Sequence, residues 1–196
     1  MVQVRVTPKT RNPFTIKALS ISGVTWKWHV LNHARICPDR RHHRHRPPEG
    51  ERCKGGTRNQ AIGRSRGGLT TKIVALVDAL GNLVRFVLLP GQRHDTIGVP
   101  PLIEGVAFGA LLGDKAFDVD WLRADLDARG AVAVIPPKAS RKSLIACDRA
   151  MYRWRHLIEN CFAKLKEFRA VATRYDKTDG SFRATINLAA AIIASR

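Results

Sequence analysis

The most informative stretch of this chain is Tyr152-Arg-Trp-Arg-His-Leu-Ile-Glu-Asn-Cys-Phe-Ala-Lys-Leu-Lys166. Tyr152, Arg155, Glu159 and Lys166 are separated by intervals of three, four and seven residues, which place side chains on one face of an α-helix. The residues that can pack this helix on a core are Leu157, Ile158, Cys161, Phe162 and Leu165. One carboxylate among several cations on a rigid element suits the holding of a divalent metal against a phosphate backbone.

Composition bounds the class of protein. A chain of 196 residues with 44% hydrophobic residues predicts one domain, with or without an appendage. No apolar run reaches membrane-spanning length and the amino terminus lacks a signal peptide, so we expect a cytoplasmic protein. The net charge of +18 indicates a polyanionic partner. Nucleic acid is favoured over a membrane surface, because no basic amphipathic anchor is found.

Residues 1–53 differ from the rest of the chain. They show no sustained helical or strand period, and the basic run Arg40-Arg-His-His-Arg-His-Arg46 predicts loop or disorder. Residues 2–6 alternate weakly and are a candidate for a short strand. The histidines and cysteines of this segment match no structural zinc spacing, and a disulfide framework is not expected of a cytoplasmic chain. We therefore place a domain boundary between residues 53 and 54.

From residue 70 the sequence becomes regular. It predicts two strands, 71–78 and 83–90, joined by a turn at Gly81-Asn82, and then a short helix at 97–105 broken by Pro100 and Pro101. Two further strands are predicted at 110–114 and 131–137, on either side of a helix at 119–129. The helix at 152–168 follows, and a last helix at 182–194 is expected to pack through Leu188, Ile192 and Ile193. Strands that alternate with helices argue for an α/β fold with a helix-covered sheet.

These motifs together resemble the bacterial DDE-type insertion-sequence transposases of the fifth insertion-sequence group. The resemblance rests on the Y-x2-R-x3-E-x6-K pattern from Tyr152 to Lys166, on 63–72 (GRSRGGLTTK), on 112–118 (LGDKAFD) and on 169–177 (RAVATRYDK). It covers about residues 54–196. It implies an RNase H-like mixed sheet flanked by helices, in which this chain is expected to lack the first strand. It also implies partners: the element's terminal inverted repeats, target double-stranded DNA, and a second copy of the chain.

The resemblance implies that two Asp and one Glu hold Mg²⁺ or Mn²⁺ for phosphodiester cleavage and strand transfer. Asp114 matches the second Asp and Glu159 the Glu, and both are assigned as catalytic metal ligands. Each has a plainer alternative: Asp114 as a helix cap, and Glu159 as the partner of a cation one turn away.

Six residues are candidate DNA contacts: Tyr152, Arg155, Lys166, Arg64, Arg66 and Lys72. The first three follow from the resemblance. The other three lie in a glycine-rich basic segment whose backbone can approach a phosphate. A charged, solvated helix face is the alternative for the first group, and a generic basic loop is the alternative for the second. The loop with Lys138, Arg141 and Lys142 is equally generic.

The first Asp of the family has no counterpart in a matching strand. Asp39 lies at nearly the right distance, but in the basic run. If the Arg, His and Pro codons are CGN, CAY and CCN, a one-base shift lets codons 40–47 read Asp-Ala-Thr-Ile-Val-Thr-Ala-His. Our hypothesis is that residues upstream of about Lys54 are translated out of frame.

The function expected is a transposase impaired by loss of one acid. One alternative is a non-catalytic DNA-binding remnant or inhibitor of an intact transposase, and another is a product that folds poorly.

Overall fold

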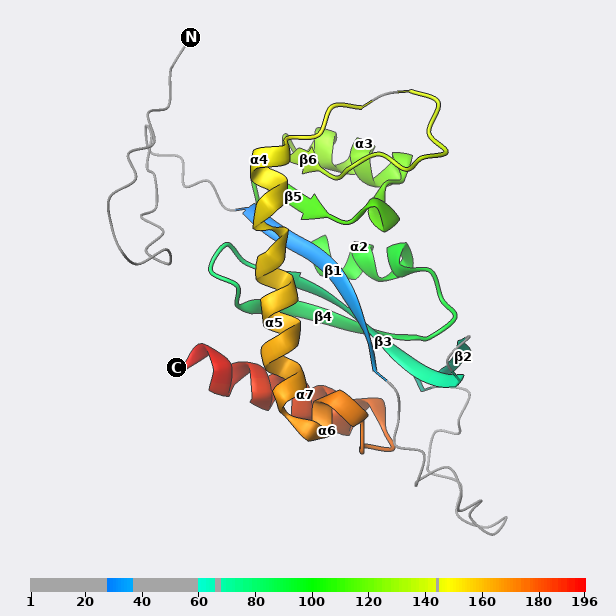
Figure 1. Cartoon of the computed structure of the whole chain (residues 1–196), viewed down its shortest axis with the longest axis vertical. Coiled ribbons are helices and arrows are strands. Elements are labelled where there is room, and N and C mark those ends of the chain that lie inside the picture. Colours follow the sequence, from blue (N-terminus) through cyan, green and yellow to red (C-terminus); the bar gives the residue numbers. More distant parts are fainter. Residues whose placement is uncertain (1–27, 37–59, 66–67, 144) are drawn as a thin grey trace.

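The computed structural model describes residues 28–36, 60–65, 68–143 and 145–196 as a six-stranded mixed sheet covered by helices (Figure 1). The strands are β1 (Trp28–Ile36), β2 (Gly63–Ser65), β3 (Gly68–Val77), β4 (Leu83–Pro90), β5 (Ala110–Gly113) and β6 (Val132–Val134). The α-helices are α2 (Val99–Ile103), α3 (Asp120–Ala128), α4 (Arg149–Tyr152), α5 (His156–Glu167), α6 (Arg169–Thr173) and α7 (Asp179–Ala194). The short 3-10 helices are η2 (Asp95–Gly98), η3 (Lys115–Phe117) and η4 (Arg153–Arg155).

The sheet is ordered β2-β3-β1-β5-β6, with β4 also paired to β3. β1 runs antiparallel to β3 and parallel to β5, and β5 runs parallel to β6. A mixed sheet of this order between helices is the predicted α/β, RNase H-like architecture.

Two apolar cores lie on opposite faces of the sheet. On one face, α5, α6 and α7 pack on alternate residues of β1 and β3, such as Val30 and Ala75. On the other face, α2 and α3 pack on the intervening residues, such as Leu31 and Leu76. In Figure 1, α5 runs nearly vertically and crosses in front of the oblique strand β1, with α6 and α7 near its carboxyl end. The sheet with its two cores is therefore a three-layer structure that places α5 over the central strands.

β1 departs from the sequence-based expectation. The chain was expected to lack the first strand of the fold, but Trp28–Ile36 lies at the centre of the sheet between β3 and β5. The strand lies inside the segment predicted to be irregular. The apolar pattern that marks this strand is short. Val30, Ala34 and Ile36 lie on one buried face of the strand, while Leu31 is buried on the other. The predicted strand at 2–6, the basic run and Asp39 lie outside the described residues.

The predicted hairpin is confirmed. β3 and β4 are joined by residues 78–82, in which Gly81 has a φ of +86° and Asp78 Oδ1 accepts hydrogen bonds from the backbone N–H groups of Leu80 and Asn82. Only glycine adopts such a φ without strain, so the turn chemistry read from the sequence fixes the register of the two strands.

Three helices differ in detail from the prediction. Pro100 and Pro101 occupy the first turn of α2 and begin it, because a helix's first residues have no intrahelical partner for their N–H groups. The helix predicted at 152–168 is divided into α4, η4 and α5. In α7, Phe182, Ile186 and Ala189 face the core, whereas the predicted packing residue Leu188 is 65% exposed. The described residues contain no helix long and apolar enough to cross a membrane.

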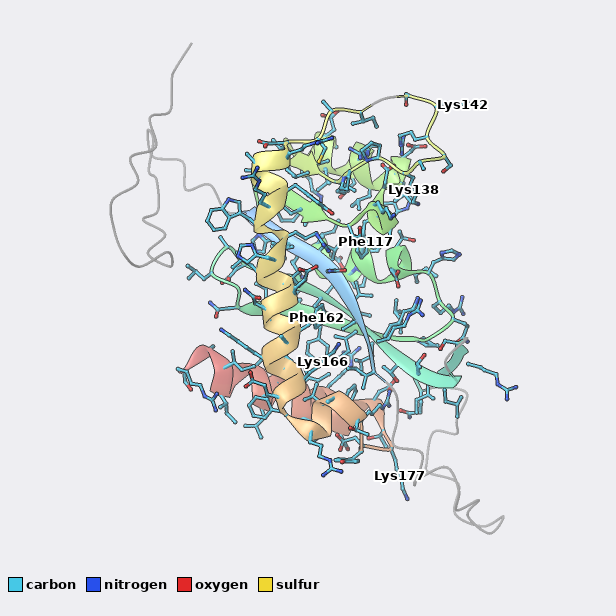
Figure 2. The ribbon with its side chains drawn as sticks, in the orientation of Figure 1. Phe117, Lys138, Lys142, Phe162, Lys166 and Lys177 are labelled. Carbon is cyan, nitrogen blue, oxygen red and sulfur yellow. The ribbon has the colours of Figure 1, made fainter. Side chains whose placement is uncertain are left out.

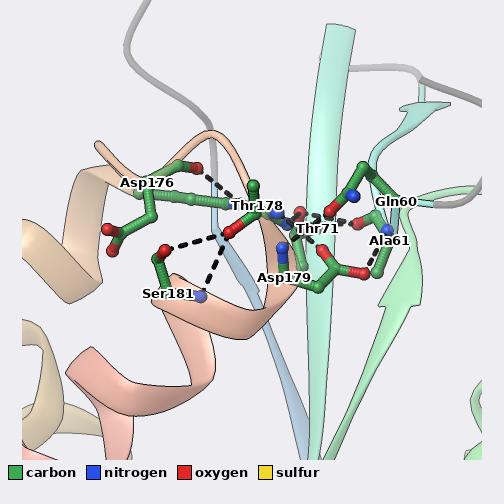
Figure 3. Close-up of polar contacts among 8 residues, drawn as sticks. Gln60, Ala61, Thr71, Asp176, Thr178, Asp179 and Ser181 are labelled. Carbon is green, nitrogen blue, oxygen red and sulfur yellow. Dashed lines mark hydrogen bonds and ion pairs between the residues drawn. The ribbon is translucent and has the colours of Figure 1, made fainter. Parts of the chain in front are cut away.

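A buried arginine ties the carboxyl-terminal helices to the sheet (Figure 3). Arg174, with a φ of 42°, is 2% exposed. Its guanidinium donates to the Thr71 hydroxyl, the Ala61 carbonyl and Asp179 Oδ1, the last at 2.6 Å. Asp179 Oδ2 in turn accepts the Ala61 N–H at 2.7 Å. Residues more than a hundred positions apart are thereby held together next to the end of α5.

Candidate metal and DNA site

Asp114 stands immediately after β5, at the carboxyl end of a strand in the parallel part of the sheet. Its Oδ1 accepts the backbone N–H of Lys115 at 2.6 Å and so caps η3. The capping alternative is therefore present in the structure. A carboxylate has two oxygens and several lone pairs, so one such bond orients the group and leaves acceptor capacity for a cation.

Glu159 lies in the first turn of α5, with its side chain 53% exposed. Arg155 Nη2 lies 2.8 Å from its Oε1. The alternative role as the partner of a cation one turn away is therefore also present. The buried side of α5 consists of the five residues predicted from the sequence, Leu157, Ile158, Cys161, Phe162 and Leu165. Glu159 follows Ile158 directly and therefore lies at the edge of this buried side, where its side chain is partly exposed.

Tyr152 connects the two carboxylates. α4 and η4 both contact β5, which brings Tyr152 close to the strand end that carries Asp114. Burial raises the pKa of the Tyr152 phenol, the charge of Arg155 lowers it, and the negative charges of Asp114 and Glu159 raise it further. The Arg155 guanidinium lies over the Tyr152 ring, 5.6 Å from its centroid. The carboxylate that follows β5 and the carboxylate on α5 thus both act on the pKa of this one phenol.

This donor set fits a hard divalent cation in part. Mg²⁺ binds through one or two carboxylates, retained waters and substrate phosphates, and Asp114 and Glu159 supply two carboxylates. Within the described ranges no cluster of three or more His, Cys, Asp or Glu side chains could hold a metal. When bound, such an ion polarises a phosphodiester and activates an attacking oxygen. The protein's own part is to orient the carboxylates and to supply the cations beside them.

The predicted DNA contacts do not form a single surface. Lys166 is exposed on α5, on the face that carries Glu159, and Arg64 is exposed in β2. Lys72 is only 5% exposed, and its ammonium donates to the Arg93 carbonyl at 2.6 Å and to Asp95 Oδ1 at 2.9 Å. Lys72 is therefore a structural residue of the β3–η2 contact rather than a phosphate ligand. Arg66 lies outside the described residues.

Asp118 is a buried acid that the sequence analysis did not single out. Asp118 accepts hydrogen bonds from Arg123, Arg141 and the Lys138 N–H, at 2.7, 2.9 and 2.8 Å. Burial alone would raise the pKa of this carboxyl, but the bonds from Arg141, Lys138 and Arg123 lower it to about 2. The network anchors the loop after β6 that carries Lys138 and Lys142, far from Lys166 at the lower end of α5 (Figure 2).

Comparison with known proteins agrees with this arrangement. Residues 33–194 match the family model described as "Transposase DDE domain". A Brucella ovis protein named "Putative transposase for insertion sequence element IS6501" is 37% identical over 127 residues, which are 64% of this chain and 98% of that protein. No solved structure matched.

The fold and the match over residues 33–194 thus define a DDE-domain protein. The chain belongs to the transposase DDE domain family. Members of this family depend on divalent metal ions, which agrees with the acidic pair beside the sheet.

Proposed function

We propose that this chain is the transposase of a bacterial insertion sequence, that it binds the element's terminal inverted repeats and target DNA, and that Asp114 and Glu159 together hold Mg²⁺ or Mn²⁺. The observation that carries the proposal is the match of residues 33–194 to the transposase DDE domain, together with the packing of α4 and η4 on β5, the strand that Asp114 follows. The similarity to a protein named for an insertion sequence supports it.

The residues around the acids have distinct proposed roles. Arg155 and Lys166 bind DNA phosphates on either side of the scissile bond. Lys166 lies on the face of α5 that carries Glu159, and Arg155, the last residue of η4, is paired with Glu159. Tyr152 hydrogen-bonds or stacks near the cut end through its partly exposed phenol. Arg64 contributes an outlying phosphate contact from β2. A homodimer holds two DNA ends when the protein is active.

The chemistry proposed is in-line displacement at a phosphodiester. The oxygen of a water or a 3′-hydroxyl attacks phosphorus as it loses its proton, and the opposite 3′-oxygen leaves; Asp114 and Glu159 would hold the ion that would activate the attacking oxygen. Catalysis depends on charge neutralisation by the ion and the nearby cations. With two carboxylates instead of three, we propose that binding of DNA persists while cleavage and strand transfer are strongly impaired.

A nicking assay on terminal inverted repeats tests this function. We expect weak Mg²⁺- or Mn²⁺-dependent product that disappears in Glu159→Ala and is retained in Glu167→Ala, which removes an exposed carboxylate at the other end of the same helix. Product that survives Glu159→Ala would contradict the proposed role of Glu159.

A second function, a non-catalytic DNA-binding inhibitor of an intact transposase, is favoured by one observation: the described residues offer no set of three acids. It predicts a mobility shift with repeat DNA and no metal-dependent product. Added to an intact family member, such a protein lowers that enzyme's product in proportion to its concentration. The nicking assay therefore separates the two functions directly.

A further inference from the structure

Asn32 lies beside Asp114 across the parallel pair of strands. The register pairs Trp28 with Ala110 and continues to Leu31 with Gly113. One residue further along each strand are Asn32 and Asp114. Asp114 still has extended backbone, with φ −71° and ψ 160°, so the pleat continues to it. The two residues are therefore neighbours at the carboxyl end of β5.

Both residues belong to the face of the sheet that α5 covers. On β1, Val30 and Ala34 lie in the core beneath α5, and alternate residues of a strand share a face, so Asn32 is on the same side. On β5, Leu112 lies in that core, and Asp114 follows it by two residues.

α5 completes the arrangement. It contacts β1 directly, and Asn32 is 9% exposed. Glu159 stands in the first turn of this same helix, at the edge of its buried side, so β1, the end of β5 and α5 each carry one oxygen-bearing side chain. A hard cation takes oxygen ligands of these kinds.

We propose that Asn32 occupies the third ligand position of the metal site and that its neutral amide leaves the site one negative charge short. This inference rests on the proposed pairing of Asp114 and Glu159. An amide oxygen can coordinate a hard cation, but the affinity of oxygen-ligand sites depends strongly on how many ligands are charged. The chain alone therefore binds metal weakly, and a DNA phosphate at the site supplies the missing charge.

Asparagine and aspartate have nearly the same shape, so Asn32→Asp tests the charge alone. Measured by titration calorimetry without DNA, this variant should bind Mn²⁺ at least about tenfold more tightly than the unchanged chain. Its melting temperature should fall in the absence of metal, because two carboxylates then adjoin each other, and should recover when Mn²⁺ is added.

The matched control is Asn187→Asp, which adds the same charge at an exposed position on α7. It should leave both the Mn²⁺ affinity and the metal response of the melting temperature unchanged. Equal Mn²⁺ affinity in Asn32→Asp and the unchanged chain would overturn the inference, as would an equal gain in Asn187→Asp.

A second measurement uses the unchanged chain, so its outcome does not depend on whether a variant folds. In the unchanged chain with bound repeat DNA, the side-chain carbonyl ¹³C signal of Asn32 is followed by NMR during a Mg²⁺ titration. We expect it to shift together with the carboxyl carbons of Asp114 and Glu159. If the two acids respond and Asn32 does not, the inference fails while the proposed metal site stands. If neither acid responds, the proposed site itself fails.

Discussion

The guanidinium of Arg155 lies 2.8 Å from the carboxylate of Glu159, so the acid proposed to hold a metal ion is already paired with a cation. Both groups are partly exposed, and pairs of this kind on a helix contribute only about 0.3–0.5 kcal/mol. A divalent ion or a DNA phosphate can therefore separate them at low cost. The pair keeps Glu159 near its working position in the absence of both.

Release of that pair should change metal and DNA binding in opposite directions. Arg155→Met removes the competing cation, so we expect Mn²⁺ affinity without DNA to rise about twofold. The same variant should bind repeat DNA less tightly, because a phosphate contact is lost. Calorimetry and a mobility-shift assay measure the two effects. Arg153→Met is the control, since Arg153 is an exposed arginine two positions earlier in the same 3-10 helix, η4. A fall in Mn²⁺ affinity in Arg155→Met would argue that Arg155 organises the site instead.

Lys166 offers a test of the DNA-binding face of α5. Each phosphate contact contributes about one unit to the slope of log affinity against log salt, so Lys166→Ala should reduce that slope by about one. Lys164→Ala removes an exposed lysine two positions earlier, on the side of α5 near the β3–β4 turn, and should have little effect. Equal changes in the two variants would indicate non-specific attraction by net charge, and no particular face.

Asp118 should give the protein a pH-dependent stability at acid pH. Its pKa is lowered from 3.8 to about 2, so the folded state favours the ionised form. The resulting stabilisation is present above pH 4 and is lost as the pH falls from about 4 towards 2. We expect Asp118→Asn to lower the free energy of unfolding at pH 7 by on the order of 2 kcal/mol and to flatten this part of the profile. Urea unfolding at several pH values measures both effects. An unchanged profile in Asp118→Asn would contradict this assignment.

Arg174 should be a large contributor to stability. Arg174→Met leaves the Thr71 hydroxyl and Ala61 carbonyl without its donors and Asp179 without its cation, and we expect a loss of about 3 kcal/mol. Arg183→Met removes an exposed arginine from α7 and should cost less than about 0.5 kcal/mol. Thermal unfolding compares the two variants. Equal melting temperatures would show that the contacts of Arg174 with Thr71, Ala61 and Asp179 do not stabilise the fold.

The regular half of the fold was predictable because its signals are local. A glycine that needs positive φ marked the turn at Gly81, and the apolar period of α5 predicted its five buried residues. In contrast, Leu188 on α7 shows the limit of periodicity. Because α7 is apolar on several sides, its sequence pattern does not determine which side packs against the sheet.

The central strand β1, with its Asn32, was not predicted, because tertiary contacts and not the local sequence pattern make this segment a strand. Trp28–Ile36 is surrounded by sequence without a period, and only pairing with β3 and β5 makes it a strand. The burial of Lys72 was missed for a similar reason: its partner Asp95 lies 23 residues away. A basic residue in a glycine-rich segment predicts phosphate binding from composition alone, whereas a distant carboxylate decides its actual role.

Iron-directed cleavage tests most directly the proposal that Asp114 and Glu159 hold one metal ion. Fe²⁺ bound in place of Mg²⁺ and treated with ascorbate and peroxide releases hydroxyl radicals that cut the backbone nearby, and mass spectrometry locates the cuts. We predict cuts next to both Asp114 and Glu159, suppressed by excess Mg²⁺ and weakened at both places by either Asp114→Asn or Glu159→Gln. Cuts at only one of these acids, or at neither, would contradict a single ion held between them.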